Sequence, residues 1–217
     1  MKPNFIQEER LWKKGYKVTG IDESGRGPIA GPVVAGAVIV NPRFRMRSMR
    51  LKFRTKDLLM EVKDSKQLSP QKRERLFKIA LEHPDIEWKV ARVSQKVIDK
   101  INIQNASELA MLRAVKKLKT KQNFLIIDGN RLNSERLKSM NHKLIVKADQ
   151  KVFSCALASI MAKVIRDRIM EGYHKKYPCY GFNKHKGYFT KLHKKTLKKN
   201  GVSVIHRKSF MPIKEMI

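Results

Sequence analysis

The chain has few cysteines, few acidic residues and no long hydrophobic segment. Two of its 217 residues are cysteine, Cys155 and Cys179, which excludes a disulfide framework and is typical of reduced thiols in a cytoplasm. The longest run of apolar residues and glycine, VVAGAVIV at 33–40, is far shorter than the roughly 20 residues that a membrane-spanning helix needs. The first residues, MKPNFIQEERLWKKGYK, contain no apolar signal-peptide core. We therefore expect a soluble, cytoplasmic protein.

Negative charge is scarce, with 19 Asp and Glu against 49 Lys and Arg, a formal net charge of +30. Such an excess of positive charge indicates a polyanionic partner, and nucleic acid is the first candidate. The alternative is an ordinary solvated surface rich in lysine. Two segments are densely basic, and each either contacts a phosphate backbone or stays solvated. In residues 43–56, Arg and Lys alternate with Phe, Met and Leu, which predicts an extended ribbon with one basic face; the other segment is 191–200.

The hydrophobic pattern predicts a single α/β domain without repeats or linkers. Most of the predicted strands precede or alternate with helical segments, which favours a mixed sheet with helices packed on it. Small residues along the last predicted helix would let it approach the sheet closely. The predicted strands are 17–23, 33–40, 86–93, 123–128 and 143–149, and the predicted helices are 105–118, capped by Asn105, and 153–165.

Acidic residues close three of the predicted strands. They are Asp22 with Glu23, Asp128 and Asp149. Binding sites in open α/β sheets form just beyond strand ends, so these acids are expected to converge if their strands are neighbours. Successive side chains of a regular strand point to opposite faces, so Asp22 and Glu23 share a site only if the strand bends or ends there. Any one of these acids alone is more often a turn former or helix cap.

Carboxylates that gather in one place repel each other, and divalent cations relieve the repulsion. Mg²⁺ takes oxygen ligands and commonly shares carboxylates with substrate phosphates. Two such ions activate a water and stabilise the leaving oxygen in phosphodiester cleavage. A basic protein with an acidic pocket is therefore interpreted as a metal-dependent nuclease. A zinc site is not indicated, because the spacing of His174, His185, His193 and His206 fits no compact ligand set.

Five motifs, in one order along most of the chain, resemble ribonuclease HII, the prokaryotic type 2 ribonuclease H. They are GIDESGRGPIAGPVVAGAVIV (20–40), DSKQLS (64–69), IIDGN (126–130), VKADQKVFSCALASIMAKVIRDR (146–168) and the segment 180–210 with HKGY. The resemblance implies an RNase H-like fold, a five-stranded mixed sheet flanked by helices with a helical C-terminal extension. It implies a catalytic core at 1–170 and the extension at 171–217, packed on the same domain.

The same resemblance implies an activity and the residues that carry it. Asp22, Glu23, Asp128 and Asp149 would be both the catalytic acids and the ligands of two Mg²⁺ or Mn²⁺ ions. The family hydrolyses the RNA strand of RNA–DNA hybrids, leaving 3′-hydroxyl and 5′-phosphate ends, and nicks duplex DNA on the 5′ side of an embedded ribonucleotide. A monomer acting on these two nucleic acids is expected, with no membrane partner.

The substrate-binding residues are implied in the same way. Gly25-Arg26-Gly27 would read the ribose 2′-hydroxyl, the group that distinguishes RNA from DNA. Lys66 would contact a phosphate and Tyr188 would pack on the sugar at the RNA–DNA junction.

The chain departs from the usual family pattern at three positions, and three rival interpretations remain. Ser24 and Ala148 replace the usual Ala and Gly, and Gln150 replaces a small residue beside Asp149. Ribonuclease HIII has a Glu as its fourth acid and an extra N-terminal domain. The other rivals are a different nuclease with the RNase H fold, and a basic nucleic-acid-binding protein whose acids are inert.

Overall fold

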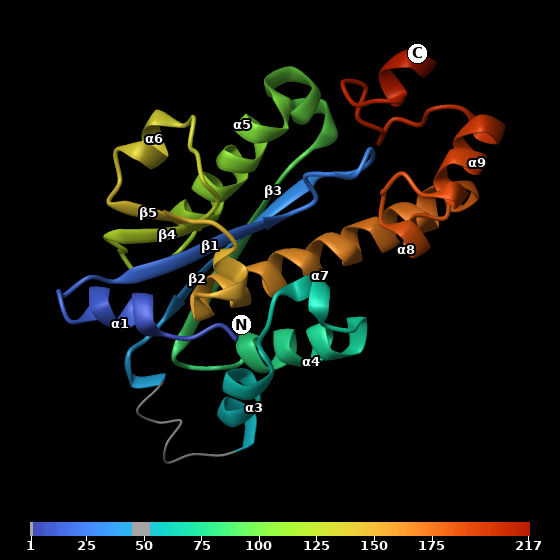
Figure 1. The fold of residues 1–217 in the computed structure, drawn as a ribbon. Coiled ribbons are helices and arrows are strands. Elements are labelled where there is room, and N and C mark those ends of the chain that lie inside the picture. Colours follow the sequence, from blue (N-terminus) through green and yellow to red (C-terminus); the bar gives the residue numbers. More distant parts are fainter. Residues whose placement is uncertain (1, 45–52) are drawn as a thin grey trace.

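The computed structural model describes residues 2–44 and 53–217, which form a mixed five-stranded sheet with helices on both faces (Figure 1). The strand order is β3-β2-β1-β4-β5. Strand β1 pairs antiparallel with β2 and parallel with β4, so it is the strand at which the sheet changes direction. The strands are β1 (Val18–Ser24), β2 (Val33–Val40), β3 (Ile86–Val93), β4 (Phe124–Asp128) and β5 (His142–Ile145).

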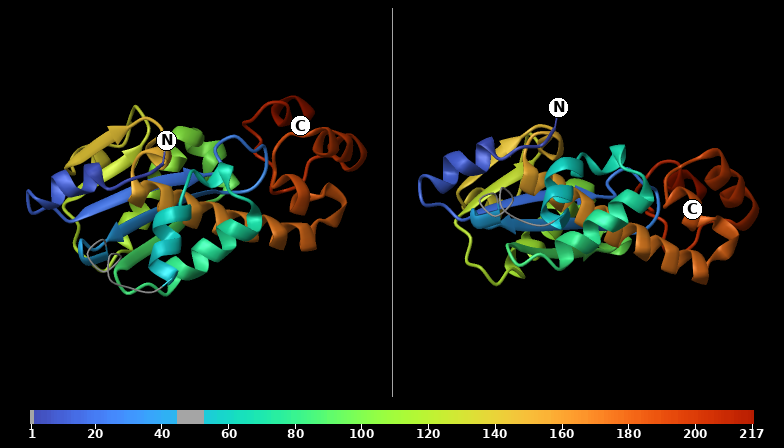
Figure 2. Two further views of the ribbon diagram at one scale, coloured as in Figure 1. Left: turned by 60° about the horizontal axis from the view of Figure 1, so that its bottom comes forward. Right: turned by 90° about the horizontal axis from the view of Figure 1, so that it is seen from below.

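The helices form one layer on each face of the sheet, and the C-terminal elements gather beyond one end (Figures 1 and 2). One layer holds α3 (Phe53–Glu61), α4 (Pro70–Leu81) and α7 (Phe153–Lys176), and the other holds α5 (Gln95–Lys116) and α6 (Glu135–Lys138). No helix within the described ranges, α7 included, is long and apolar enough to cross a membrane. The remaining helical elements are α1 (Ile6–Trp12), η1 (Ser65–Gln67), η2 (Ala148–Gln150), η3 (Pro178–Tyr180), α8 (Phe182–His185), α9 (Lys191–Asn200) and η4 (Ile213–Met216).

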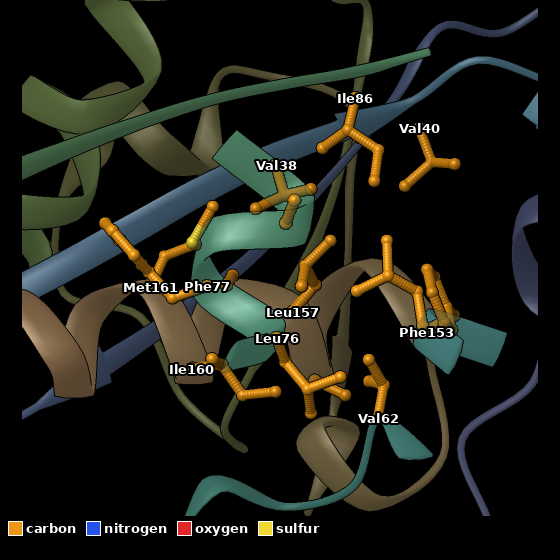
Figure 3. Packing of buried hydrophobic residues seen from close by; sticks show 14 of the residues in the cluster. Val38, Val40, Val62, Leu76, Phe77, Ile86, Phe153, Leu157, Ile160 and Met161 are labelled. Atoms are coloured by element: carbon orange, nitrogen blue, oxygen red, sulfur yellow. The ribbon is translucent and has the colours of Figure 1, made fainter. Parts of the chain in front are cut away.

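Strand β2 is apolar throughout because it is buried on both faces. Val38 and Val40 point to the layer with α4 and α7, where Figure 3 shows them beside Leu157. Ala35 and Ala37 belong to the cluster on the opposite face, under α5. The run VVAGAVIV therefore covers two hydrophobic cores at once.

Helix α7 lies directly against the sheet because glycines face it on two strands. A β-carbon on Gly20 of β1 would lie 2.4 Å from the backbone carbon of Ser154, and one on Gly36 of β2 would lie 2.4 Å from the Ala158 oxygen. Both contacts are with helix backbone, which cannot rotate away as a side chain does. The expectation that this helix approaches the sheet closely is confirmed.

We predict that Gly36→Ala lowers the free energy of unfolding by roughly 1–3 kcal/mol, because the added methyl forces α7 away from β2. The matched control is Gly172→Ala on the same helix, where a β-carbon would have no atom within 4 Å. That change should stabilise the protein by up to about 1 kcal/mol, since alanine is the better helix former. Urea denaturation followed by circular dichroism measures both. Equal effects would show that α7 does not press on Gly36.

Several boundaries differ from the sequence-based expectation. The strand predicted at 143–149 ends at Ile145, where the chain turns into η2. The helix predicted from Asn105 begins earlier, and Asn102, with φ of 61°, interrupts α5 and accepts a hydrogen bond from the Asn105 N–H. Helix α7 runs through Gly172 to Lys176. It thus crosses residue 170, and the division into a core and an extension there stays a prediction.

The two basic segments differ from each other in structure. Residues 43–44 and 53–56 are helical, so the extended ribbon predicted for 43–56 is wrong at both ends, and 45–52 lie outside the described residues. The segment 191–200 is α9, with Thr190 as its N-cap and with His193 and Leu197 buried. Its lysine side chains face solvent, which leaves them accessible to a phosphate backbone.

Candidate active site

Two of the predicted acids lie where β1 and β4 separate. The parallel pairing of these strands ends with Ile21 opposite Ile127, so Asp22 and Asp128 are the next residues on adjacent strands. Strand β1 does not end there, because it continues along β2 as far as Ser24. The sequence predicted that the strand must bend or end at Asp22. The structure shows that only its pairing with β4 ends there, while its pairing with β2 continues. Asp22 projects beyond the last β1–β4 pair into the gap between the strands.

The third acid arrives through a tight turn after β5. Lys147 has a left-handed backbone, with φ of 56°, and η2 follows it. The Ala148 N–H then donates a hydrogen bond of 2.8 Å to Oδ1 of Asp128, which fixes the turn against β4. Carboxylate oxygens of Asp22, Asp128 and Asp149 lie within 4.8 Å of one another. Asp149 thus joins the other acids from a helical turn instead of from a strand end.

Glu23 lines the same pocket but is not one of this group of three. Its Oε1 lies 3.3 Å from an Nη of Arg26. Its Oε2 is buried and has no hydrogen-bond partner within the described ranges. Since a buried, unpartnered carboxylate oxygen is costly, this atom marks a place where a cation or a water would bind.

Burial and mutual repulsion raise the pKa of the clustered carboxyl groups. The pKa of Asp22 is raised well above its usual value by burial, and then by the neighbouring Glu23 and Asp128. Burial, followed by Asp64 and Asp128, raises the pKa of Asp149 to about 6. Burial also raises the pKa of Glu23, although Arg26 opposes it. The four neighbouring carboxyl groups are hard oxygen donors, and such a cluster suits one or more divalent cations such as Mg²⁺ or Mn²⁺.

The pocket has a volume of about 180 Å³ and holds every site residue that the sequence predicted. Tyr188 is 43% exposed, and its ring lies 3.6 Å from where a β-carbon on Gly27 would be. Arg26 is also held by Gln104, at 2.5 Å from Nη2 to Oε1. Besides the four acids, the lining residues are Ser24, Gly25, Arg26, Gly27, Ser65, Lys66, Ser159, Lys163 and Tyr188.

Sequence reasoning missed Lys163, which lines the pocket, and Asp64, which lies beside it. Asp64 lies beside Asp149 and accepts a hydrogen bond of 3.2 Å from Nε2 of Gln150, the residue that departs from the family pattern. Lys163 lies on α7 and donates to Asp167 at 2.6 Å. Ser159 stands one helical turn before Lys163 and also lines the pocket, but nothing in the sequence marked either residue as part of the site.

Three of the four histidines considered for zinc form a buried cluster, and two of them, His193 and His206, are hydrogen-bonded in a chain that ends at the Tyr188 carbonyl. The Ser203 N–H donates to Nδ1 of His206, so the proton of that ring is on Nε2, 3.0 Å from Nε2 of His193. His193 then donates through Nδ1 to the Tyr188 carbonyl at 2.9 Å. Burial lowers the pKa of both rings to about 4, so they are neutral near pH 7. The third ring, His185, stacks on His193. These histidines support the segment that carries Tyr188.

Comparisons with known proteins agree with this geometry. The family model "Ribonuclease HII" matches residues 19–213. The chain is 45% identical to the ribonuclease HII of Endomicrobium trichonymphae over 98% of this chain and 94% of the relative. Its structure is similar to that of ribonuclease H2 from Pyrococcus horikoshii OT3, with a TM-score of 0.74, 28% identity, and coverage of 92% of this chain and 96% of the other.

A more distant structure shows likeness of fold alone. It is Bst-RNase HIII in complex with Mn²⁺, with a TM-score of 0.65 at 17% identity, covering 93% of this chain and 69% of that chain.

Proposed function

Because the chain belongs to the ribonuclease HII family and is thus a metal-dependent RNase H endonuclease, we propose that its acidic pocket cuts RNA at two kinds of site. It hydrolyses the RNA strand of RNA–DNA hybrids, and it nicks duplex DNA on the 5′ side of an embedded ribonucleotide. The observation that carries this proposal is the juxtaposition of three converging carboxylates with the Gly25–Gly27 loop in one pocket.

We propose that Asp22, Glu23, Asp128 and Asp149 hold two divalent cations, either Mg²⁺ or Mn²⁺. When bound, such ions supply the positive charge that activates water and stabilises the leaving oxygen. The protein's own part is to fix the acids before substrate arrives. The hydrogen bond from Ala148 to Asp128 and the one from the Glu23 N–H to Asp22, at 2.7 Å, set the orientation of two carboxylates. Arg26 restrains Glu23 in the same way.

The basic residues around the acids hold the phosphate backbone. Lys66 lines the pocket beside Asp149, where its ammonium would contact the phosphate next to the cleaved bond. Lys163, which lies on α7, is a second lysine that lines the pocket. The exposed lysines of α9 extend the basic surface along the C-terminal residues 171–217, which we propose to be the substrate-binding extension.

Recognition of the ribose is assigned to the Gly25–Gly27 loop and Tyr188. Glycines 25 and 27 have no side chains, so the loop's backbone groups are open to the ribose 2′-hydroxyl, which is both donor and acceptor. Tyr188 stands next to Gly27 with its ring half-exposed, where it would pack on the sugar. This arrangement favours nicking at a single ribonucleotide, whereas the ribonuclease HIII alternative calls for a Glu in place of Asp149.

The test is a duplex DNA with one ribonucleotide, incubated with Mg²⁺ or with Mn²⁺, next to an RNA–DNA hybrid of the same sequence. We expect a nick on the 5′ side of the ribonucleotide and cleavage of the hybrid. The all-DNA duplex is the control and should stay intact. Cleavage of the hybrid without the nick would favour the ribonuclease HIII alternative, and no cleavage of either would favour the inert binding protein.

A further inference from the structure

Two arginines are fully buried. Arg166 on α7 and Arg207 in the C-terminal segment have exposed fractions of zero. Within residues 2–44 and 53–217, neither guanidinium group forms a salt bridge. Burial lowers the pKa of Arg207 to about 9. A buried cation that forms no salt bridge is rare and costly, so these two arginines need other partners that stabilise the charge.

Arg207 binds the loop before β2 through three backbone carbonyls. Its Nη2 donates to the Gly25 oxygen, its Nη1 to the Arg26 oxygen at 2.8 Å, and its Nε to the Gly31 oxygen at 3.0 Å. The guanidinium also lies over the ring of Phe210, 4.9 Å from the centroid. The planar fork of arginine, which lysine lacks, is what allows three carbonyls to be held at once.

Arg166 holds the other end of the same loop. Its Nε donates to the Pro32 oxygen at 3.0 Å, its Nη2 to the Ala30 oxygen at 3.3 Å, and its Nη1 to the Lys186 oxygen at 3.0 Å. Gly25 packs onto this side chain, since a β-carbon there would lie 2.1 Å from Nε of Arg166. Together the two arginines bind five carbonyls of residues 25–32, and Arg166 connects them to the segment that carries Tyr188.

The clamp on the carbonyls also fixes the direction of two amide groups. In a trans peptide the N–H points opposite to the C=O of the preceding residue. When Arg207 draws the Gly25 and Arg26 carbonyls to itself, the N–H groups of Arg26 and Gly27 are turned away from it. Neither N–H donates a hydrogen bond to any part of the chain that the structure describes. Both residues line the acidic pocket.

We propose that Arg207, with Arg166, is a positioning residue for ribose recognition: it holds the Gly25 and Arg26 carbonyls so that the free N–H groups of Arg26 and Gly27 face the 2′-hydroxyl. This inference rests on the proposed function. The buried charge polarises the loop's peptide groups in the same sense, which strengthens the amides as donors. Arg207 itself touches no substrate, so it acts on discrimination between RNA and DNA and leaves binding to the phosphate backbone to other residues.

The test compares Arg207→Lys with the unaltered protein on two duplexes, one all-DNA and one with a single ribonucleotide. Dissociation constants are measured in Ca²⁺, chosen to prevent turnover. We expect Arg207→Lys to lose the preference for the ribonucleotide by at least about tenfold, because a loop displaced by even 1 Å misplaces its donors. Affinity for the all-DNA duplex should change little. With Mg²⁺, kcat/KM on the ribonucleotide duplex should fall by a similar factor.

Ile86→Val, a core change in β3 remote from the pocket, is the control for a general loss of stability. It should leave the preference intact. Unchanged preference in folded Arg207→Lys would overturn the inference, and so would equal losses of affinity for both duplexes. If that variant does not fold, Phe210→Leu decides, since it removes the ring beneath Arg207 and keeps an apolar side chain against the neighbouring hydrophobic clusters. A selective loss of about threefold supports the clamp, and no loss overturns it. Failure of the unaltered protein to nick the ribonucleotide duplex in Mg²⁺ would instead contradict the proposed function.

Discussion

Asp22→Asn will abolish cleavage and, at the same time, make the metal-free protein more stable. The carboxylate lies at the centre of the acidic group, and its loss should lower kcat by at least about a thousandfold. The stability gain follows from repulsion, because an ionised Asp22 is buried beside Glu23 and Asp128 and its pKa is raised accordingly. An amide of the same shape removes that repulsion. The melting temperature should rise by about 2–4 °C for each kcal/mol relieved.

The measurements are initial rates on the ribonucleotide duplex, hybrid affinity by fluorescence anisotropy, and melting without divalent cations. Asp57→Asn is the matched control, since Asp57 is a surface carboxylate that pairs with Arg75 and does not line the pocket. It should keep full activity and gain no stability. Hybrid binding should persist in Asp22→Asn, because lysines carry most of it. Full activity in Asp22→Asn would refute the assignment of the acids.

The sheet could be predicted largely from the sequence because its strands are strongly apolar and carry clear ends. Prediction failed where local signals compete with tertiary contacts. Gly172 disfavours a helix locally, yet α7 continues through it on the strength of its packing. The boundary near Asp149 was misjudged for a related reason, since KLIVKAD continues the apolar strand pattern while Lys147 adopts a left-handed turn. The hydrophobic pattern of a segment does not indicate where one residue adopts a left-handed backbone.

The acids of the site could be expected from their positions after strands, but their neighbours could not. Asp22 and Asp128 follow paired strands, so their proximity follows from the parallel register once the strand order is known. Asp64 and Gln150 meet across 86 positions of sequence, and only the fold brings them together. The burial of the two arginines could not be predicted from the sequence either. Arg207, for example, stands in a basic segment whose composition is typical of an exposed surface.

Removing divalent cations will abolish cleavage, and adding them will raise the melting temperature much more at pH 8 than at pH 5. The pKa of Asp149 is raised to about 6 in the metal-free fold, and that of Asp22 is raised as well. The stabilising contribution of Asp149 is complete below pH 4 and is lost as the pH rises through about 6, and that of Asp22 is lost as the pH rises through its own raised pKa. Cations bind the deprotonated acids and restore it, by about 2.7 kcal/mol at a concentration a hundredfold above Kd.

Other groups titrate in the same range, so the comparison with and without cations must be made at each pH. Glu8, whose pKa burial raises to about 6, loses stabilisation as the pH rises, whereas His193 and His206 lose it as the pH falls from 6.5 toward 4. These contributions cancel in the difference that Mg²⁺ or Mn²⁺ makes. The difference should shrink in Asp22→Asn because one ligand is missing. A cation-induced rise that is equal at both pH values, or unchanged in that variant, would place the cations elsewhere on the protein.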